Sequence, residues 1–170
     1  RMAHDAAVPL KAVPLEIDSW FAARGWRARR HQREMLGASD AGLHALLVAD
    51  TGAGKTLAGF LPTLAAFCPS RLEGAPPPEG LHTLYVSPLK ALAHDVQRNL
   101  VTPVEEMGLP IRIETRSGDT PSDRKARQRA RPPHVLLTTP ESLSLLLSYP
   151  EAQTLFAGLK RVVIDEVHAF

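Results

Sequence analysis

The sequence predicts an α/β fold in which a parallel β-sheet carries helices on both faces. The chain has 170 residues, 44% of them apolar, which is enough to bury one core and favours a single domain. Short apolar runs alternate with longer helical patterns along most of its length. Repeated strand–helix–strand units of this kind have parallel strands and pack their helices against the sheet.

The expected strands are short apolar runs bounded by turn residues, as buried parallel strands are. They span residues 45–49, 81–87, 111–115, 134–138 and 161–165. Helical patterns span residues 55–67, 89–107, 121–131 and 140–147, and an earlier helix is expected to begin at Asp18 or Ser19 and to end near Gly25. Residues 69–80 contain three consecutive prolines and predict a loop. We expect residues 1–17 to be a lead-in segment and residues 18–170 to form the domain.

Composition excludes several classes of protein. Cys68 is the single cysteine, so there is no intramolecular disulfide and no cysteine-based metal site. There is no 18-residue apolar run and no signal-peptide pattern, which predicts a soluble protein with no membrane partner. The net charge is only +2, but five arginines lie between Arg24 and Arg33 and five basic residues between Arg124 and Arg131. Each run is either a solvated face or a surface that faces phosphates.

The loop from Ala49 to Thr56 follows one expected strand and opens the next expected helix, which is the context of a phosphate-binding P-loop. Its glycines allow a tight turn whose N–H groups converge on phosphate oxygens, and the helix directs its positive end at the same anion. Lys55 adds a charge for the β- and γ-phosphates of ATP, and the Thr56 hydroxyl is a ligand for Mg²⁺. Alanine at position 49 replaces the usual first glycine of the pattern. The predicted nucleotide-binding residues of this loop are Thr51, Gly52, Ala53, Gly54, Lys55 and Thr56.

The last expected strand ends in two adjacent carboxylates, Asp165 and Glu166. A carboxylate at the tip of a parallel strand can hold Mg²⁺ opposite Thr56, which assigns Asp165 as a metal ligand. Glu166 is expected to orient and deprotonate the attacking water, so the predicted catalytic residues are Glu166, Lys55 and Asp165. Alone, an Asp-Glu pair after a strand is more often a surface turn. The P-loop upstream favours the catalytic interpretation.

Together with the P-loop, the Asp-Glu-Val-His sequence at 165–168 resembles the DEXH group of superfamily 2 helicases. Residues 81–92, 115–120 and 137–143 resemble its large helicase-related members, and residues 21–26 and 155–160 are most similar to bacterial ligase-associated DEXH helicases. The resemblance covers residues 18–170 and implies a RecA-like P-loop NTPase domain in the bacterial cytoplasm, with ATP and Mg²⁺ as cofactors. It implies an ATP-dependent helicase or translocase that moves on single-stranded DNA or tailed duplexes and acts in DNA repair beside a ligase or nuclease, with RNA as an alternative substrate.

The resemblance also implies roles for individual residues. It places Gln32 against the adenine edge, which an amide can recognise by donating and accepting together, and Trp26 against the face of the base. A solvent-facing glutamine and a core tryptophan are the alternatives. His168 is implied to couple hydrolysis to movement. The implied nucleic-acid contacts are Ser87, Pro88, Leu89, Lys90, Gly118, Thr138, Thr139, Pro140 and Glu141. Helix capping is the alternative role for Thr139 and Pro140, and backbone recognition predicts weak sequence preference and strong salt dependence.

Two parts implied by the resemblance are absent from the sequence up to Phe170. One is a strand between the P-loop strand and the acidic strand, which carries a Ser-Ala-Thr motif. The other is a second RecA-like domain with an arginine finger. We therefore expect a domain without its C-terminal strands, completed by the rest of a helicase chain and slow at hydrolysing ATP alone. The sequence leaves open a non-catalytic nucleotide- or nucleic-acid-binding module and, more remotely, a nucleotide kinase.

Overall fold

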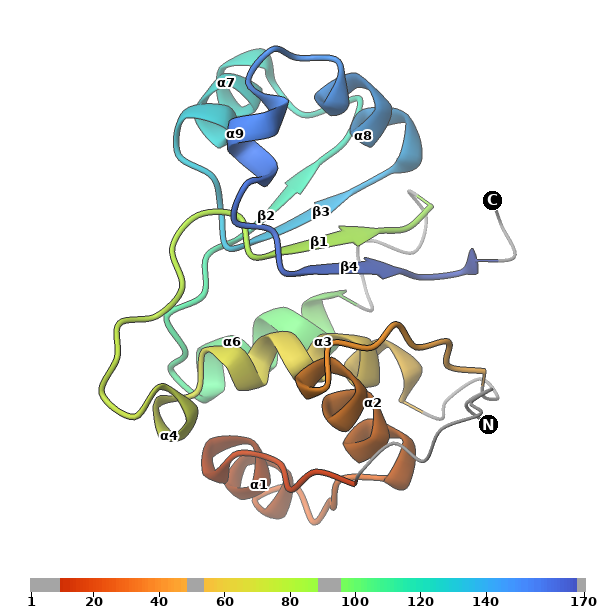
Figure 1. The fold of residues 1–170 in the computed structure, drawn as a ribbon, viewed down its shortest axis with the longest axis vertical. Coiled ribbons are helices and arrows are strands. Elements are labelled where there is room, and N and C mark those ends of the chain that lie inside the picture. The colour runs from red at the N-terminus through yellow and green to blue at the C-terminus, as the bar shows by residue number, and fades with distance from the viewer. Residues whose placement is uncertain (1–9, 49–53, 89–95, 168–170) are drawn as a thin grey trace.

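The computed structural model describes residues 10–48, 54–88 and 96–167. In this part of the chain four parallel strands form one sheet in the order β2-β3-β1-β4 (Figure 1). Their bounds are Thr83–Val86 for β1, Ile113–Arg116 for β2, Val135–Thr138 for β3 and Arg161–Ile164 for β4. The predicted parallel sheet is confirmed, and each of these strands lies at or within one residue of a predicted range.

The register of the sheet aligns the carboxyl ends of all four strands. Val86 of β1 pairs with Thr138 of β3 and with Ile164 of β4, and Thr138 pairs with Arg116 of β2. Those are the last residues of their strands. The residues that follow them therefore meet at one edge of the sheet, which is where open α/β sheets bind their ligands.

Helices cover both faces of the sheet, as predicted (Figure 1). One face carries α7, α8 and α9, which span Ser122–Ala130, Pro140–Leu147 and Ala152–Phe156. The other carries α1 (Leu15–Ala22), α2 (Arg30–Asp40), α3 (Lys55–Ala66), α4 (Pro69–Leu72), a π-helix η2 (Gln97–Val101) and α6 (Thr102–Glu106). Alternate residues of β1 enter two cores: Tyr85 joins the larger one with α1, α2 and α3, while Leu84 and Val86 join the smaller one with α8 and α9.

The prediction of a strand at residues 45–49 is wrong for its described part, residues 45–48. Within them only Leu47 forms a bridge, and Leu46 and Val48 are 53% and 60% exposed. A strand requires a partner along its length to pair its backbone groups. Among the described residues β4 pairs with β1 alone, so the sheet offers this segment no continuous partner.

Two helical predictions differ from the structure in their limits. Helix α1 begins at Leu15, ahead of the expected cap, because Ile17, Trp20 and Phe21 form a buried stripe that includes its first turn. Asp18 lies inside the helix near its amino end, where a negative charge is favourable. The predicted helix 89–107 is described from residue 96, where it continues as η2 and α6, and the predicted loop 69–80 begins with α4.

Polar side chains near the opposite, amino edge of the sheet have structural partners. The His82 ring lies 2.9 Å from the Thr83 hydroxyl, and Arg161 donates to Ser39 Oγ at 2.7 Å. Burial, with the charge of Arg161 as a second cause, lowers the pKa of His82 to about 4. This histidine is therefore neutral at pH 7 and part of the packing.

Cys68 is fully buried between the end of α3 and the start of α4. Its Sγ donates to the carbonyl of Leu64 at 3.4 Å. Burial raises the pKa of the Cys68 thiol to about 12, and the nearby Glu16 carboxylate adds to the effect. Cys68 therefore packs as a small buried residue. None of the helices that the structure describes has the length and apolar character that a bilayer crossing requires.

Candidate functional site

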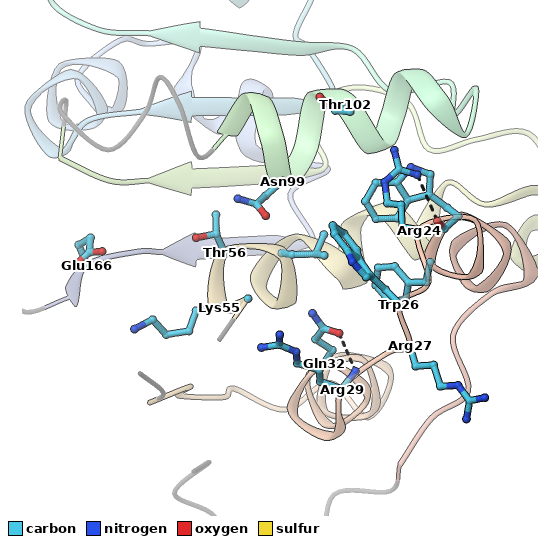
Figure 2. A pocket seen from close by; sticks show the side chains of 14 residues that line it. Arg24, Trp26, Arg27, Arg29, Gln32, Lys55, Thr56, Asn99, Thr102 and Glu166 are labelled. Atoms are coloured by element: carbon cyan, nitrogen blue, oxygen red, sulfur yellow. Dashed lines mark hydrogen bonds between the residues drawn. The ribbon is translucent and has the colours of Figure 1, made fainter. Parts of the chain in front are cut away.

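A cavity of about 630 Å³ opens at the start of α3 (Figure 2). Figure 2 shows Lys55 and Thr56 between Glu166 on one side and Gln32 with Trp26 on the other. An elongated ligand with a charged end and a planar end fits this order of side chains. The residues that line the cavity are Trp20, Phe21, Arg24, Trp26, Arg27, Arg29, Gln32, Gly54, Lys55, Thr56, Leu57, Asn99, Thr102 and Glu166.

The phosphate end is the first turn of α3. Helix α3 has 12 residues and begins at Lys55, with Gly54 as its N-cap in the left-handed conformation at φ 76°. The free N–H groups and the dipole of such a helix end favour an anion. The described part of the predicted P-loop, from Gly54 to Thr56, lies at this helix start. Thr51, Gly52 and Ala53, also predicted to bind nucleotide, lie outside the described residues.

Gly54 joins the two ends of the cavity. A Cβ atom added to Gly54 would lie 3.3 Å from Nε2 of Gln32, and the positive φ disfavours any side chain there. The loop and α2 therefore approach closely because position 54 is glycine. Gly42 has a similar φ of 68°, but nothing lies within 4 Å of an added Cβ. A substitution at Gly42 therefore causes backbone strain without the side-chain contact that a substitution at Gly54 would also make.

Gly54→Ala should weaken nucleotide binding about tenfold, because left-handed backbone costs alanine about 1–2 kcal/mol and the new methyl displaces the Gln32 amide. Isothermal titration with ATP and a non-hydrolysable analogue measures the change. Gly42→Ala is the matched control: it should lower the free energy of unfolding by a similar amount and leave nucleotide affinity unchanged. Equal affinities for Gly54→Ala and the unaltered protein would show that the close approach of Gly54 and Gln32 has no role in binding.

Gln32 and Trp26 form the other end of the cavity. Gln32 is 4% exposed, and its Oε1 accepts from the backbone N–H of Arg29 at 2.9 Å, which caps α2. An amide oxygen has a second lone pair and the Nε2 keeps its two donors, so donating and accepting groups remain for a base edge. The solvent-facing alternative for Gln32 is wrong, since the side chain is buried beside the cavity.

Trp26 presents nearly half of its surface, 47%, and packs edge-on against Trp20 with ring centroids 5.9 Å apart. Trp20 is itself fixed: its Nε1 donates to Glu106 at 2.6 Å and the Arg24 guanidinium lies 4.1 Å above its ring. Arg24 also pairs with Glu106. Trp26 therefore packs against a tryptophan that is itself held by Glu106 and Arg24, and its half-exposed ring is suited to contact with a planar ring.

Asp165 and Glu166 follow the last residue of β4. Asp165 Oδ2 accepts from the Tyr85 hydroxyl at 2.6 Å, and Oδ1 accepts from the Glu166 backbone N–H at 2.9 Å. Glu166 has a left-handed backbone with φ 53°, which is unusual for a residue with a side chain and occurs at functional sites. That conformation brings Glu166 to the cavity while Asp165 stays behind it, half-buried.

The donor set near the cavity fits Mg²⁺. Thr56 and Asp165 supply oxygen atoms, the ligands that Mg²⁺ prefers. Across residues 10–48, 54–88 and 96–167, no group of three or more His, Cys, Asp and Glu side chains gathers as a metal cage. Magnesium bound with a nucleotide characteristically uses one or two protein ligands, phosphate oxygens and water, so two oxygen donors match that mode.

Several lining residues were not predicted from the sequence, among them Asn99, Thr102 and Arg29. Asn99 belongs to the π-helix η2 and Thr102 begins α6. A π-helix adds a residue to a turn and shifts the faces of the helix, and such turns are frequent at functional sites. Because residues 89–107 were expected to form one regular helix, the pattern assigned no side chain of this segment to the nucleotide.

The other predicted residues lie where strands end at the carboxyl edge. The buried Ser87 Oγ follows β1 and has no hydrogen-bond partner among the described residues. The Thr138 hydroxyl donates to the carbonyl of Arg116 at 2.9 Å, and Thr139 Oγ1 accepts from the Ser142 N–H at 3.3 Å. Thr139 therefore caps α8, with Pro140 in its first turn and Glu141 exposed beside it. The capping alternative is confirmed for Thr139. Leu89, Lys90 and His168 lie outside the described residues.

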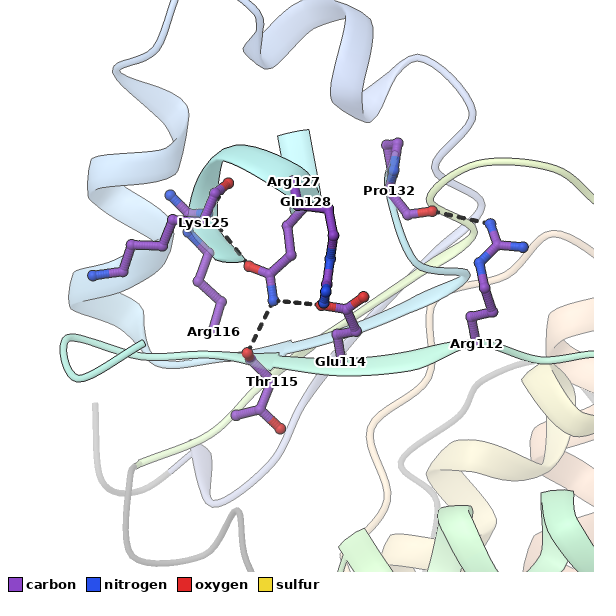
Figure 3. A network of polar contacts seen from close by, with 8 residues as sticks. All are labelled: Arg112, Glu114, Thr115, Arg116, Lys125, Arg127, Gln128 and Pro132. Atoms are coloured by element: carbon purple, nitrogen blue, oxygen red, sulfur yellow. Dashed lines mark hydrogen bonds and ion pairs between the residues drawn. The ribbon is translucent and has the colours of Figure 1, made fainter. Parts of the chain in front are cut away.

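A polar network anchors the basic helix α7 to the edge strand β2 (Figure 3). The buried Arg116 donates to the carbonyl of Lys125 at 3.0 Å, and burial lowers its pKa. Gln128 donates to Glu114 at 2.9 Å, and Arg127 pairs with the same carboxylate at 3.1 Å. Lys125 Nζ donates to the carbonyl of Gly118 at 2.8 Å, which closes the turn after β2. Part of the basic run 124–131 thus has a structural role.

The sequence profile of the DEAD/DEAH box helicase family matches residues 29–170. The chain is 40% identical over 99% of its length to the Lhr helicase/probable uracil glycosylase of Mycolicibacterium smegmatis, of which it covers 12%. It is 36% identical over 90% of its length to the ATP-dependent helicase Lhr-Core of Methanocaldococcus jannaschii, of which it covers 19%. The chain therefore spans less than a fifth of the length of either relative.

Solved structures give the same result for the fold. The helicase Lhr of Mycobacterium smegmatis, bound to single-stranded DNA and AMP-PNP, superposes with a TM-score of 0.76 at 40% identity over 96% of this chain and 21% of that one. The DUF1998 helicase MrfA, bound to DNA and AMPPNP, gives a TM-score of 0.74 at 30% identity over 92% and 21%. The fold is that of a RecA-like helicase domain, as the sequence predicts.

Proposed function

The chain belongs to the DEAD/DEAH box helicase family, and on that premise we propose that it is the ATP-binding domain of a helicase or translocase that moves on DNA. The observation that carries the proposal is the shared carboxyl edge of the sheet. The cavity with Lys55, Thr56 and Glu166 lies at the same edge as the strand ends at Ser87 and Thr139. A nucleotide and a nucleic-acid backbone bound there would contact the ends of neighbouring strands, since β1 pairs with both β3 and β4.

In the proposed mechanism the cavity holds ATP along its length. Gln32 and Trp26 take the base, and the first turn of α3 with Lys55 takes the β- and γ-phosphates. Thr56 and Asp165 would hold Mg²⁺, which neutralises charge on the phosphates when bound. Glu166 orients the attacking water and accepts its proton. Each assignment of these residues is part of the proposal.

For nucleic acid we propose backbone recognition by the helix start at Thr139–Glu141, by Ser87 and Pro88 and by the turn at Gly118. Ser87 supports this: its hydroxyl is buried without a partner in the described structure, which costs free energy, and a phosphate oxygen would supply a partner if a shift of the backbone at this edge let it reach the hydroxyl. Leu89 and Lys90, and His168 as the coupling residue, complete the proposed set.

The test measures ATP hydrolysis with and without single-stranded DNA, on the chain and on the chain extended by the second RecA-like domain we propose it works with. We expect stimulation by DNA in the extended protein, and DNA affinity that falls at least tenfold between about 50 and 200 mM salt, because phosphate contacts release counterions. Nucleotide and DNA binding without any stimulated hydrolysis would favour the non-catalytic binding module instead. Binding that is insensitive to salt would contradict backbone recognition.

The narrower parts of the proposal concern biological context. We propose a bacterial cytoplasmic enzyme of the ligase-associated DEXH type that acts in DNA repair, with a ligase or nuclease as partner. Residues 21–26 and 155–160 support that assignment by resemblance. Co-purification of the protein with an ATP-dependent ligase, and DNA damage sensitivity on deletion of its gene, test it. Equal stimulation by RNA and DNA would redirect the proposal to RNA.

A further inference from the structure

Tyr85 occupies the middle of the sheet beneath the acidic pair. It is 1% exposed in β1, and its ring stacks on Phe60 of α3 with centroids 4.8 Å apart and planes inclined by 28°. Tyr85 pairs with Val163 of β4, and Asp165 lies two residues further along. Because side chains of a strand alternate between faces, Val163, Asp165 and Tyr85 share the face that carries α3.

The Tyr85 hydroxyl contacts the carboxylate of Asp165. It donates to Oδ2 at 2.6 Å, a length typical of a hydrogen bond from a hydroxyl to a carboxylate. Oδ1 is fixed separately by the Glu166 N–H at 2.9 Å. With one hydrogen bond on each oxygen, the plane of the carboxylate is set, and each oxygen retains a lone pair for a cation or its water.

The same tyrosine connects Asp165 with the phosphate-binding helix. Phe60 lies on α3, five residues after Lys55, and Gly59 is so close to β4 that an added Cβ would lie 3.2 Å from Val163 Cγ1. The ring stack therefore holds α3 and β1 together at the depth where the hydroxyl meets Asp165. Thr56 lies on α3 and Asp165 follows β4. The contacts of Tyr85 with Phe60 and with Asp165 therefore help to set the position of Asp165 relative to Thr56.

We propose that Tyr85 is a positioning residue that orients Asp165 for Mg²⁺, and thereby sets the metal dependence of nucleotide binding. The inference rests on the proposed function. Tyr85 is 1% exposed and its hydroxyl donates to Asp165, so it acts through the carboxylate and not on the nucleotide. Partners that hold a metal-binding carboxylate in place commonly change metal affinity by tenfold or more when they are removed.

The test is Tyr85→Phe, which removes the hydroxyl and keeps the ring against Phe60. Binding of a non-hydrolysable ATP analogue is measured while Mg²⁺ is titrated, and again in EDTA. We expect the Mg²⁺ concentration at half-maximal effect to rise about tenfold, with the affinity in EDTA unchanged within about twofold. Thr63→Val is the matched control: it removes another buried hydroxyl between α3 and β1, which lies 2.9 Å from the Thr83 hydroxyl, so it should lower Tm and leave the Mg²⁺ midpoint in place.

A double-mutant cycle with Asp165→Asn identifies the route of the effect. If Tyr85 acts through Asp165, adding Tyr85→Phe to Asp165→Asn should change the Mg²⁺ midpoint no further. An unchanged midpoint in Tyr85→Phe, or full additivity in the cycle, overturns the inference and leaves the proposed function intact. Absence of any Mg²⁺ effect on nucleotide binding by the unaltered protein overturns the proposed function, and the inference with it.

Discussion

Alanine in place of Lys55 should lower the affinity for ATP by about two to four orders of magnitude. Lys55 begins α3 and lines the cavity beside Thr56, and we propose that its ammonium binds the β- and γ-phosphates. Hydrogen bonds to charged groups contribute about 1.5–3 kcal/mol each, and the loss of two corresponds to roughly this change in affinity. Titration calorimetry with ATP and with adenosine measures it. Adenosine, which lacks phosphates, should bind both proteins equally.

Lys160→Ala provides the control for the loss of one positive charge. Lys160 is an exposed lysine just before β4, at the amino edge of the sheet and away from the cavity. Its removal should leave ATP affinity unchanged. Thermal unfolding followed by circular dichroism should give the same Tm for Lys55→Ala and the unaltered protein. Normal ATP affinity in a folded Lys55→Ala protein would remove the P-loop from the proposed site.

Glu166→Gln should leave ATP binding intact and slow hydrolysis by about 10²–10⁴-fold, the usual contribution of a general base. Glutamine keeps the size of the side chain and a hydrogen-bonding oxygen but does not accept a proton from water. The rate of phosphate release at saturating ATP and DNA, in the protein with both RecA-like domains, measures the effect. Glu151→Gln, at the exposed start of α9, should hydrolyse ATP at the normal rate.

A normal rate in Glu166→Gln would assign proton acceptance to another group and leave Glu166 as a surface residue. Reduced binding together with reduced hydrolysis would indicate instead that the left-handed turn at Glu166 shapes the cavity. The two variants thus distinguish nucleotide binding from hydrolysis, since we expect Lys55→Ala to lower the affinity for ATP and Glu166→Gln to lower the rate of hydrolysis.

Features governed by nearby residues were predictable from the sequence. Helix α8 spans Pro140–Leu147 as expected, because Thr139 caps it and proline suits its first turn. The start of α3 at Lys55 followed from the glycine before it in the same way. Local chemistry of this kind determines where an element begins. It therefore allowed the start of α3, the proposed phosphate end of the site, to be predicted.

Contacts between distant parts of the chain were not predictable from pattern. The bond from Tyr85 to Asp165 joins residues 80 apart, and the close approach of Gln32 to Gly54 depends on how α2 packs against α3. Gln32 was assigned through a family resemblance, whereas Asn99 needed the π-turn to be seen. The expected strand at 45–49 shows the same limit, because apolar residues reveal a preference for burial but not the partner that completes it.

The buried thiol of Cys68 has a practical consequence for kinetic experiments. With its pKa near 12 and no exposed surface, this one cysteine should be silent toward maleimides in the folded protein at neutral pH. A cysteine introduced by Glu151→Cys would then be the single site to accept a fluorescent dye, without a cysteine-free background. Within these 170 residues, a dye at position 151 could therefore report on nucleotide binding without labelling of Cys68.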